Sequence, residues 1–172
     1  MVRNAKGFTL IELLIVVALI GILAGIATAV LMSARISSNE ASAIGSLRAI
    51  VSAEVDFNGF NRGYATSLTT LATACPGMSV PFISQDLNAN GVTKNGFRFA
   101  VVVGTGGVAG PTDCNGGATQ SAYYATAVPV SVGMTGSRGF ATNQISAIWQ
   151  DTSGAAPVEP FTVGPTVAPI GR

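Results

Sequence analysis

Side chains that commonly carry out chemistry are scarce in this chain of 172 residues. It has no histidine, which removes the commonest general base and the commonest metal ligand. Serines are plentiful, but a serine nucleophile needs an adjacent base to activate it. The glycine-rich stretch at 104–107 lacks the Lys-Ser/Thr ending of a phosphate-binding loop. We therefore expect a protein that is not an enzyme.

One short stretch has oxygen ligands at the spacing of a metal loop. Residues 86–91 read DLNANG, so Asp86, Asn88 and Asn90 alternate ahead of a glycine, as at the start of a calcium loop. The twelfth position of such a loop carries a bidentate Glu, and this chain has Phe97 there. An Asx-rich turn explains the same residues. Calcium is thus the single cofactor candidate, and the turn is the alternative.

The two cysteines, Cys75 and Cys114, are too far apart for a C-x-x-C redox or zinc motif. In an exported domain a disulfide between them is the default expectation. Two buried free thiols are the alternative.

A long apolar segment lies near the N-terminus. Residues 13–34 contain no charged side chain and are long enough to cross a membrane core about 30 Å thick. Arg3 and Lys6 precede the segment and Arg35 follows it. Two positive charges within the first seven residues favour a cytoplasmic start. We expect this segment to be a membrane anchor.

Glu12 stands at the beginning of this apolar run. An ionisable group at a membrane boundary is expensive and indicates a function, although it could also snorkel to the interface. A secretory signal cleaved after Ala27-Thr28-Ala29 would explain the basic start and the apolar stretch. Glu12 would interrupt the core of such a signal, and the apolar run continues past the cleavage point to Met32.

Residues 6–12, which read KGFTLIE, resemble the processing site of type IV prepilins and type II secretion pseudopilins. In that family a short basic leader is cut after a glycine, the new terminal residue is N-methylated, and a glutamate lies five positions into the mature chain. The resemblance spans about the first 35 residues. It implies cleavage after Gly7, N-methylation of Phe8 and a role in assembly for Glu12.

The resemblance also implies a function and partners. It indicates a structural subunit of an extracellular type IV pilus-like filament that serves adhesion, motility or DNA uptake. A major pseudopilin of a type II secretion system and a minor, filament-initiating pilin are alternatives within the family. A simple membrane-anchored surface-binding domain is the alternative of another class. The implied partners are further copies of the chain in a helical homopolymer, prepilin peptidase, inner-membrane assembly machinery and, before assembly, membrane lipid. The precursor would lie in the inner membrane, and the filament would be extracellular or span the periplasm.

Electrostatics suggest how Glu12 would act. A carboxylate in lipid needs a positive partner, and the amine of Phe8 on a neighbouring subunit would supply one. Loss of Arg3 and Lys6 with the leader would leave seven basic and eight acidic side chains. The full chain has a formal net charge of +1, which gives no electrostatic case for nucleic acid.

Small residues recur every four positions in the apolar segment. Gly21 and Gly25 form a GxxxG pair that Ala29 and Ser33 continue, a spacing that lets helices approach closely. Ordinary membrane-helix composition is the alternative. Many type IV pilins carry a proline in this helix, whereas the first proline here is Pro76.

The expected fold is α+β, with a long N-terminal helix packed on a small antiparallel sheet, as in the pilin fold. We expect a leader at 1–7, a membrane and filament-core half of the helix at 8–34, an amphipathic half at 35–58 and a C-terminal domain at 59–172. The amphipathic half should bury Ile44, Leu47, Val51 and Val55, with Ile50 on the flank, and should end at Gly59.

The remainder of the chain should form the sheet. Strands are predicted at 96–103, 121–128, 138–142 and 145–149, and the last two should form a hairpin across residues 143 and 144. The glycine-rich stretch 104–118 should be an exposed loop. The proline-rich tail from Thr152 should be irregular.

Overall fold

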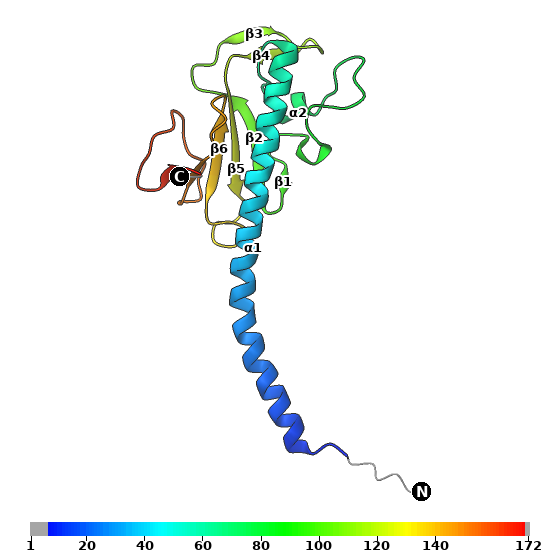
Figure 1. The fold of residues 1–172 in the computed structure, drawn as a ribbon, viewed down its shortest axis with the longest axis vertical. Coiled ribbons are helices and arrows are strands. Elements are labelled where there is room, and N and C mark those ends of the chain that lie inside the picture. Colours follow the sequence, from blue (N-terminus) through cyan, green and yellow to red (C-terminus); the bar gives the residue numbers. More distant parts are fainter. Residues whose placement is uncertain (1–6, 171–172) are drawn as a thin grey trace. The chain divides into compact units, whose positions relative to one another are not determined.

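A computed structural model describes residues 7–170, apart from the side chain of Ala29. The chain divides into two compact units, Met1–Arg35 and Ile36–Arg172, which are described separately. Helix α1, Leu10–Asn61, contributes to both units and is followed by a mostly antiparallel β region (Figure 1). The predicted α+β architecture, with a long apolar N-terminal helix ahead of an antiparallel sheet, is confirmed.

The end of α1 lies beyond the predicted stop at Gly59. The helix continues to Asn61, and Arg62 takes the left-handed conformation, with φ of 61°, that ends it. The Arg62 N–H donates to the Asn58 carbonyl at 2.8 Å. The Asn61 amide donates to the Phe57 carbonyl at 3.2 Å and accepts from the Cys114 N–H at 2.8 Å. These contacts outweigh the modest helix-breaking tendency of one glycine.

The main sheet has six strands in the order β1-β2-β5-β6-β7-β8, and every neighbouring pair is antiparallel. The strands are β1 Thr93–Lys94, β2 Phe97–Val103, β5 Tyr123–Pro129, β6 Gly139–Asn143, β7 Trp149–Asp151 and β8 Val167–Pro169. The predicted strands at 96–103, 121–128 and 138–142 correspond to β2, β5 and β6 and are confirmed.

The predicted fourth strand was misplaced. Its hairpin with β6 exists, but β7 begins only at Trp149, because Asn143 starts a wider turn. The Asn143 side-chain oxygen accepts from Ile145 N–H at 3.1 Å, and its carbonyl accepts from Ser146 N–H at 2.8 Å. Ser146 has a positive φ of 64°, which directs the chain out of an extended strand.

Two further segments contain strands that we did not predict. The glycine-rich stretch 104–118 was expected to be a plain loop, yet it includes β3, Ala109–Thr112, which pairs with β4, Ala118–Gln120, in a separate two-stranded sheet. The tail was expected to be irregular, yet β8 adds the outermost strand of the main sheet. Pro169 fits there because an edge strand leaves one side of its backbone unpaired.

The C-terminal part of α1 packs on the sheet, and the core lies between them. Its buried side chains from the helix are Ala43, Leu47, Ile50, Ala53 and Phe57, and those from the sheet are Phe97, Phe99, Val101, Tyr123, Ala125, Ala127 and Phe140. The buried face of α1 differs in part from the predicted one. Ile50, expected on the flank, is at the centre of this face, whereas Val55, expected to be buried, is 53% exposed. Buried polar residues on the helix, Glu40 and Glu54, explain the difference because they take positions that hydrophobicity alone assigns outward.

The short elements between α1 and the sheet are α2, Leu68–Leu71, and a 3-10 turn at Gln85–Leu87. The predicted disulfide between Cys75 and Cys114 is present, with a Cα–Cα distance of 5.5 Å. It joins the segment after α2 to the link between β3 and β4. By the chain-entropy argument, closing a loop of this length stabilises the fold by roughly 3–4 kcal/mol.

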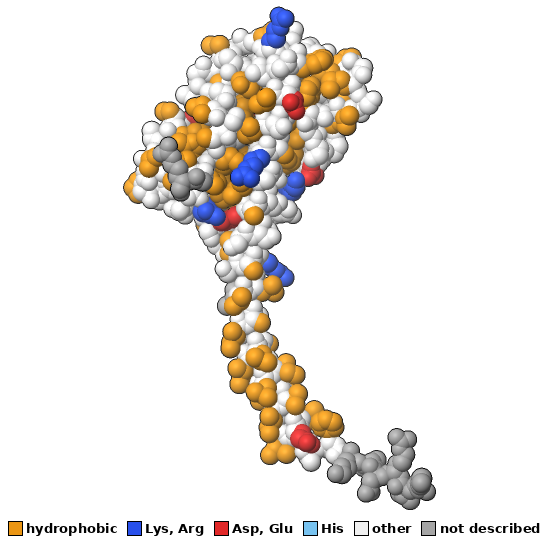
Figure 2. All heavy atoms as spheres, viewed as in Figure 1, with side chains coloured by type: hydrophobic (Ala, Val, Ile, Leu, Met, Phe, Trp, Pro, Cys, Tyr) orange, Lys and Arg blue, Asp and Glu red, His pale blue; other side chains and the backbone are white. Residues whose placement is uncertain are grey.

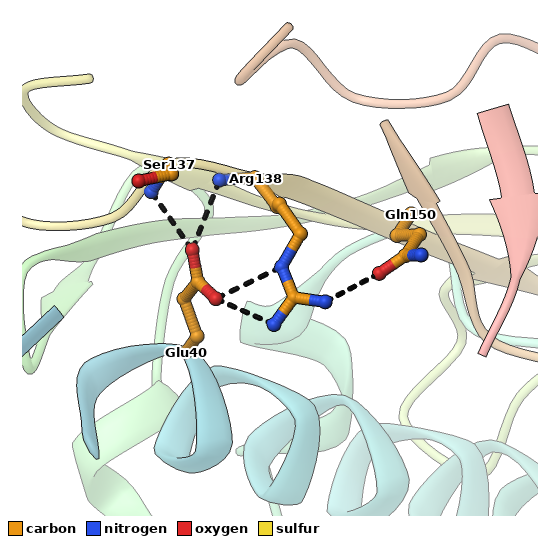
Figure 3. Close-up of polar contacts among 4 residues, drawn as sticks. All are labelled: Glu40, Ser137, Arg138 and Gln150. Carbon is orange, nitrogen blue, oxygen red and sulfur yellow. Dashed lines mark hydrogen bonds and ion pairs between the residues drawn. The ribbon is translucent and has the colours of Figure 1, made fainter. Parts of the chain in front are cut away.

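An ion pair between the buried Glu40 and the half-buried Arg138 holds α1 to the start of β6 (Figure 3). Glu40 is 5% exposed, and its Oε1 accepts from the backbone N–H groups of Ser137 and Arg138 at 2.8 and 3.1 Å. Its Oε2 accepts from Nε and Nη2 of Arg138 at 2.9 and 2.6 Å. Arg138 also donates to Gln150 on β7 at 2.6 Å. Burial alone raises the pKa of Glu40, but the hydrogen bonds from Arg138 and Ser137 and the Arg138 charge lower it overall.

A second acidic residue of α1 is buried without a cation. Glu54 is 0% exposed, and its Oε2 accepts from the Ala65 N–H at 2.9 Å. Within the described residues, Oε1 of Glu54 and the hydroxyl of the buried Tyr123 have no hydrogen-bond partner. Burial raises the pKa of Glu54 to about 8, although the Ala65 hydrogen bond acts in the opposite direction. Burial and the nearby Glu54 charge likewise raise the pKa of Tyr123.

We expect Glu40→Gln to destabilise the second unit by about 1–3 kcal/mol, because a neutral amide leaves the Arg138 charge without its partner in a partly buried site. Urea unfolding of the full chain in detergent micelles, followed by tryptophan fluorescence, measures the change. Asp56→Asn is the matched control, since Asp56 is an exposed acid on the same helix. Equal effects of the two substitutions would contradict a stabilising role for the ion pair.

Glu54 should make stability depend on pH. Its ordinary pKa is 4.5 and its folded pKa is about 8, so between these values the folded state holds the proton more tightly. Stability should therefore fall as pH rises through this window and level off above it. Glu54→Gln keeps an acceptor for Ala65 but cannot ionise. The free energy of unfolding should fall between about pH 5 and about pH 9 for both proteins, and it should fall further for the wild-type chain, by up to a few kcal/mol. Unfolding curves at the two pH values measure this difference. A parallel pH response of the two proteins would show that Glu54 is ionised when buried.

Candidate functional site

The predicted cleavage junction lies ahead of the first helix. Gly7 and Phe8 have no regular secondary structure, and Phe8 is 87% exposed. A Cβ placed on Gly7 would meet no atom within 4 Å. The bond between them is thus free of contacts with the described chain. The remainder of the predicted leader, with Arg3 and Lys6, lies outside the described residues.

The start of α1 is closed by a capping box formed by Thr9 and Glu12. The Glu12 Oε2 accepts from the Thr9 N–H at 3.0 Å and from the Thr9 hydroxyl at 2.7 Å. In return, the Glu12 N–H donates to the Thr9 hydroxyl oxygen at 3.3 Å. Such reciprocal contacts satisfy backbone N–H groups that the first helical turn leaves without partners. Glu12 therefore stabilises the first turn of α1, and the apolar segment begins directly after it.

We did not predict the role of Thr9, although the sequence contains its signal. Thr9 and Glu12 stand three residues apart ahead of an apolar run, which is the pattern of a capping box. Both Thr9 donors contact Oε2 of Glu12. Oε1 accepts no hydrogen bond from the residues that the structure describes, so the carboxylate keeps an oxygen for another donor.

The apolar side chains of α1 in the first unit are exposed on every side of the helix. All large apolar residues described between Leu10 and Met32 are exposed, and Figure 2 shows hydrophobic side chains along this part of the helix. By length and composition the segment is sufficient to cross a membrane, with none of its most apolar window buried in the chain. An apolar surface of this kind requires lipid or other apolar helices around it.

The described chain leaves space beside the small residues Gly21 and Gly25 of α1. A Cβ added at Gly21 or Gly25 would meet no atom within 4 Å, so no other part of the described chain packs there. The Thr28 hydroxyl donates to the Gly25 carbonyl at 3.0 Å, and the helix continues through both glycines. Ala29 lies in α1, but its side chain is outside the described residues.

The candidate calcium ligands are used in other contacts. The Asp86 carboxylate forms an ion pair with Lys94 at 2.6 Å, and its hydrogen bonds from Lys94 and Ser84 lower its pKa. The Asn90 side-chain oxygen accepts from the N–H groups of Leu68 and Val101 at 3.1 and 3.0 Å. These contacts favour the turn interpretation.

Asn88, the third candidate, is exposed and follows the 3-10 turn. In the described part of the chain, no group of three or more His, Cys, Asp or Glu side chains could hold a metal ion. Calcium at Asp86, Asn88 and Asn90 stays a prediction.

Comparisons with known proteins agree with the features at the N-terminus. A family model described as the prokaryotic N-terminal methylation motif matches residues 2–28. The chain is 41% identical over 69 residues to the type IV wide pilus major component PilA4 of Thermus thermophilus, over 40% of this chain and 53% of that relative. The match thus spans about half the length of the relative. No solved structure matches significantly. The chain carries the prokaryotic N-terminal methylation motif and is type IV pilin-like.

Proposed function

We propose that the chain is a structural subunit of an extracellular type IV pilus-like filament. The observation that carries this proposal is an apolar half-helix, exposed on all sides, that begins directly behind the Gly7-Phe8 junction. The methylation-motif match and the similarity to a major pilus component support it. Such a helix serves first as a membrane anchor and then as filament core, because both environments cover its apolar side chains.

Processing prepares the helix for assembly. Prepilin peptidase cuts after Gly7, and Phe8 becomes the N-methylated terminus. The cut removes Arg3 and Lys6, whose charges would otherwise hold the chain start at the cytoplasmic surface. Thr9 then stands one residue from the new amine, so the capped first turn of α1 places Glu12 close to the terminus.

Glu12 sets the register between subunits. Helices dissolved in lipid gain little from further apolar burial, so a polar attraction is the more effective guide. The amine of Phe8 on a neighbouring subunit pairs with the Glu12 carboxylate, which Thr9 contacts through Oε2 alone. Low dielectric strengthens this attraction and penalises either charge left alone. The stripe of Gly21, Gly25 and Ala29 lets a neighbouring helix approach α1 closely.

A major pseudopilin of a type II secretion system is the second candidate. The described part of α1 contains no proline, which differs from many type IV pilins. The wide-pilus relative favours the pilus. Under either function the precursor lies in the inner membrane and meets the assembly machinery there. Filaments of this chain isolated from the cell surface would favour the pilus over the pseudopilus.

Cleavage is tested by the mass of the chain extracted from membranes. We expect a chain that starts at Phe8 and carries one N-methyl group. Gly7→Leu should leave the full precursor in the membrane, because the peptidase site needs a small residue there. Gly59→Ala is the control, since its added Cβ meets no neighbour. A mature chain that starts at Met1 or at Val30 would refute the proposal.

The role of Glu12 is tested with two substitutions that separate charge from helix capping. Gln at this position retains the capping-box contact with Thr9 but loses the charge, whereas Leu loses both. We expect both variants to be cleaved and inserted, yet to form at least about tenfold fewer filaments when they are the sole subunit. Electron microscopy of sheared filaments gives number and length.

Thr9→Val is the matched control, because it removes the two hydroxyl contacts of the cap and keeps the charge; it should assemble better than either Glu12 variant. Normal filaments from Glu12→Leu would exclude charge pairing. Normal filaments from Glu12→Gln alone would assign the effect to the cap.

A further inference from the structure

A pocket of about 340 Å³ lies beside the β6–β7 turn, far in sequence from the N-terminal site. Its apolar wall includes Ile145, Trp149 and Phe161, and its polar edge includes Thr105, Asn143 and Glu159. Small-molecule sites are typically concave and mostly apolar, with a few fixed polar groups. Neither the anchor helix nor the assembly proposal makes use of this pocket.

Glu159 holds three distant segments together at the polar edge. Its Oε1 accepts from the Asn143 side-chain amide at 2.6 Å, at the end of β6. Its Oε2 accepts from the Thr105 N–H at 2.7 Å, just after β2. The carboxylate is therefore fixed in position by two hydrogen bonds before any ligand arrives, and such preorganisation lowers the cost of binding.

The charge of this carboxylate has no counterion in the described part of the chain. The two ion pairs found there are Lys94–Asp86 and Arg138–Glu40, and both donors to Glu159 are neutral amides. The pocket is thus an anionic site with an apolar wall.

Aromatic rings supply the second feature. Trp149 and Phe161 stack with ring centroids 5.5 Å apart and an interplanar angle of 25°. Tyr124 is also near Phe161, with ring centroids 6.2 Å apart, and its hydroxyl donates to the Pro157 carbonyl at 2.7 Å. The faces of aromatic rings attract cations, and tryptophan does so most strongly.

From this arrangement we infer that the pocket binds an organic cation, a guanidinium or ammonium group on an alkyl chain. The alkyl part contacts Ile145 and the aromatic wall, and the cationic group lies between Glu159 and the ring of Trp149. An anionic ligand would be repelled by Glu159. A neutral sugar could stack on the rings, but it would leave the carboxylate without a counterion.

Trp149 is the single tryptophan of the chain, so its fluorescence reports on the pocket directly. The full chain in neutral detergent micelles is titrated with N-acetyl-arginine amide and with the uncharged isostere N-acetyl-citrulline amide. We expect a saturable fluorescence change and a dissociation constant at least about tenfold lower for the arginine compound. Equal binding of the two compounds, no binding, or tighter binding of methyl glucoside would overturn the inference.

Two variants locate the interaction. Glu159→Gln should strongly reduce the preference for arginine over citrulline, whereas Asp56→Asn, which removes an equal charge outside the pocket, should retain it. Phe161→Leu should weaken arginine binding while keeping the preference. A Glu159→Gln variant that keeps the full preference would refute the site, and circular dichroism confirms that each variant is folded.

Butylguanidine, added as a third probe, carries the same single positive charge as the capped arginine and separates the two sources of such a cation. Tighter binding of butylguanidine than of the capped arginine indicates a free small cation, and the reverse indicates a side chain of a protein partner. These measurements need no filament, so their failure leaves the assembly proposal untouched.

Discussion

The apolar surface of the first part of α1 is the constraint on which the structure depends. No charge interrupts residues 13–34, and none of the described side chains there is buried by the chain itself. Lipid or neighbouring helices are the surroundings that such a surface favours, and the one ionisable side chain that α1 has ahead of Arg35, Glu12, accordingly stands at the start of the helix. A single carboxylate at this point serves the helix through Oε2 and stays open to a second donor through Oε1.

The C-terminal part of the same helix packs on the sheet and is held there in one orientation. Apolar contacts such as Leu47 and Ile50 tolerate small rotations. Buried polar residues specify the position: Glu40 contacts the start of β6, Glu54 contacts Ala65, and Asn61 contacts Cys114. Each of these leaves a costly unpaired group if the helix turns or slides.

Local patterns predicted much of this structure. The uncharged run predicted the first part of α1, and the alternation at 96–103 predicted β2, because each signal lies within one element. The errors arose where a distant residue decides the outcome. Gly59 continues the helix because Asn61 is held by Cys114, and Glu40 is buried because Arg138 lies opposite. The pocket beside Trp149 combines residues from three segments, so no sequence window contains it. Thr9 is different, since its capping pattern is local and readable.

The ion pair of Glu40 has a mechanical consequence for the proposed filament. A pull along α1 reaches the second unit through the helix backbone, and from Ile36 onward Glu40 is the first buried side chain that it meets. Its contacts are to Ser137 and Arg138, which lead directly into β6, and β6 is an interior strand bonded to β5 and β7. Tension that reaches this ion pair therefore enters the middle of the sheet, where two ladders of hydrogen bonds share it. The disulfide at Cys75 and Cys114 lies at the other end of this part of the helix, where the Cys114 N–H donates to Asn61.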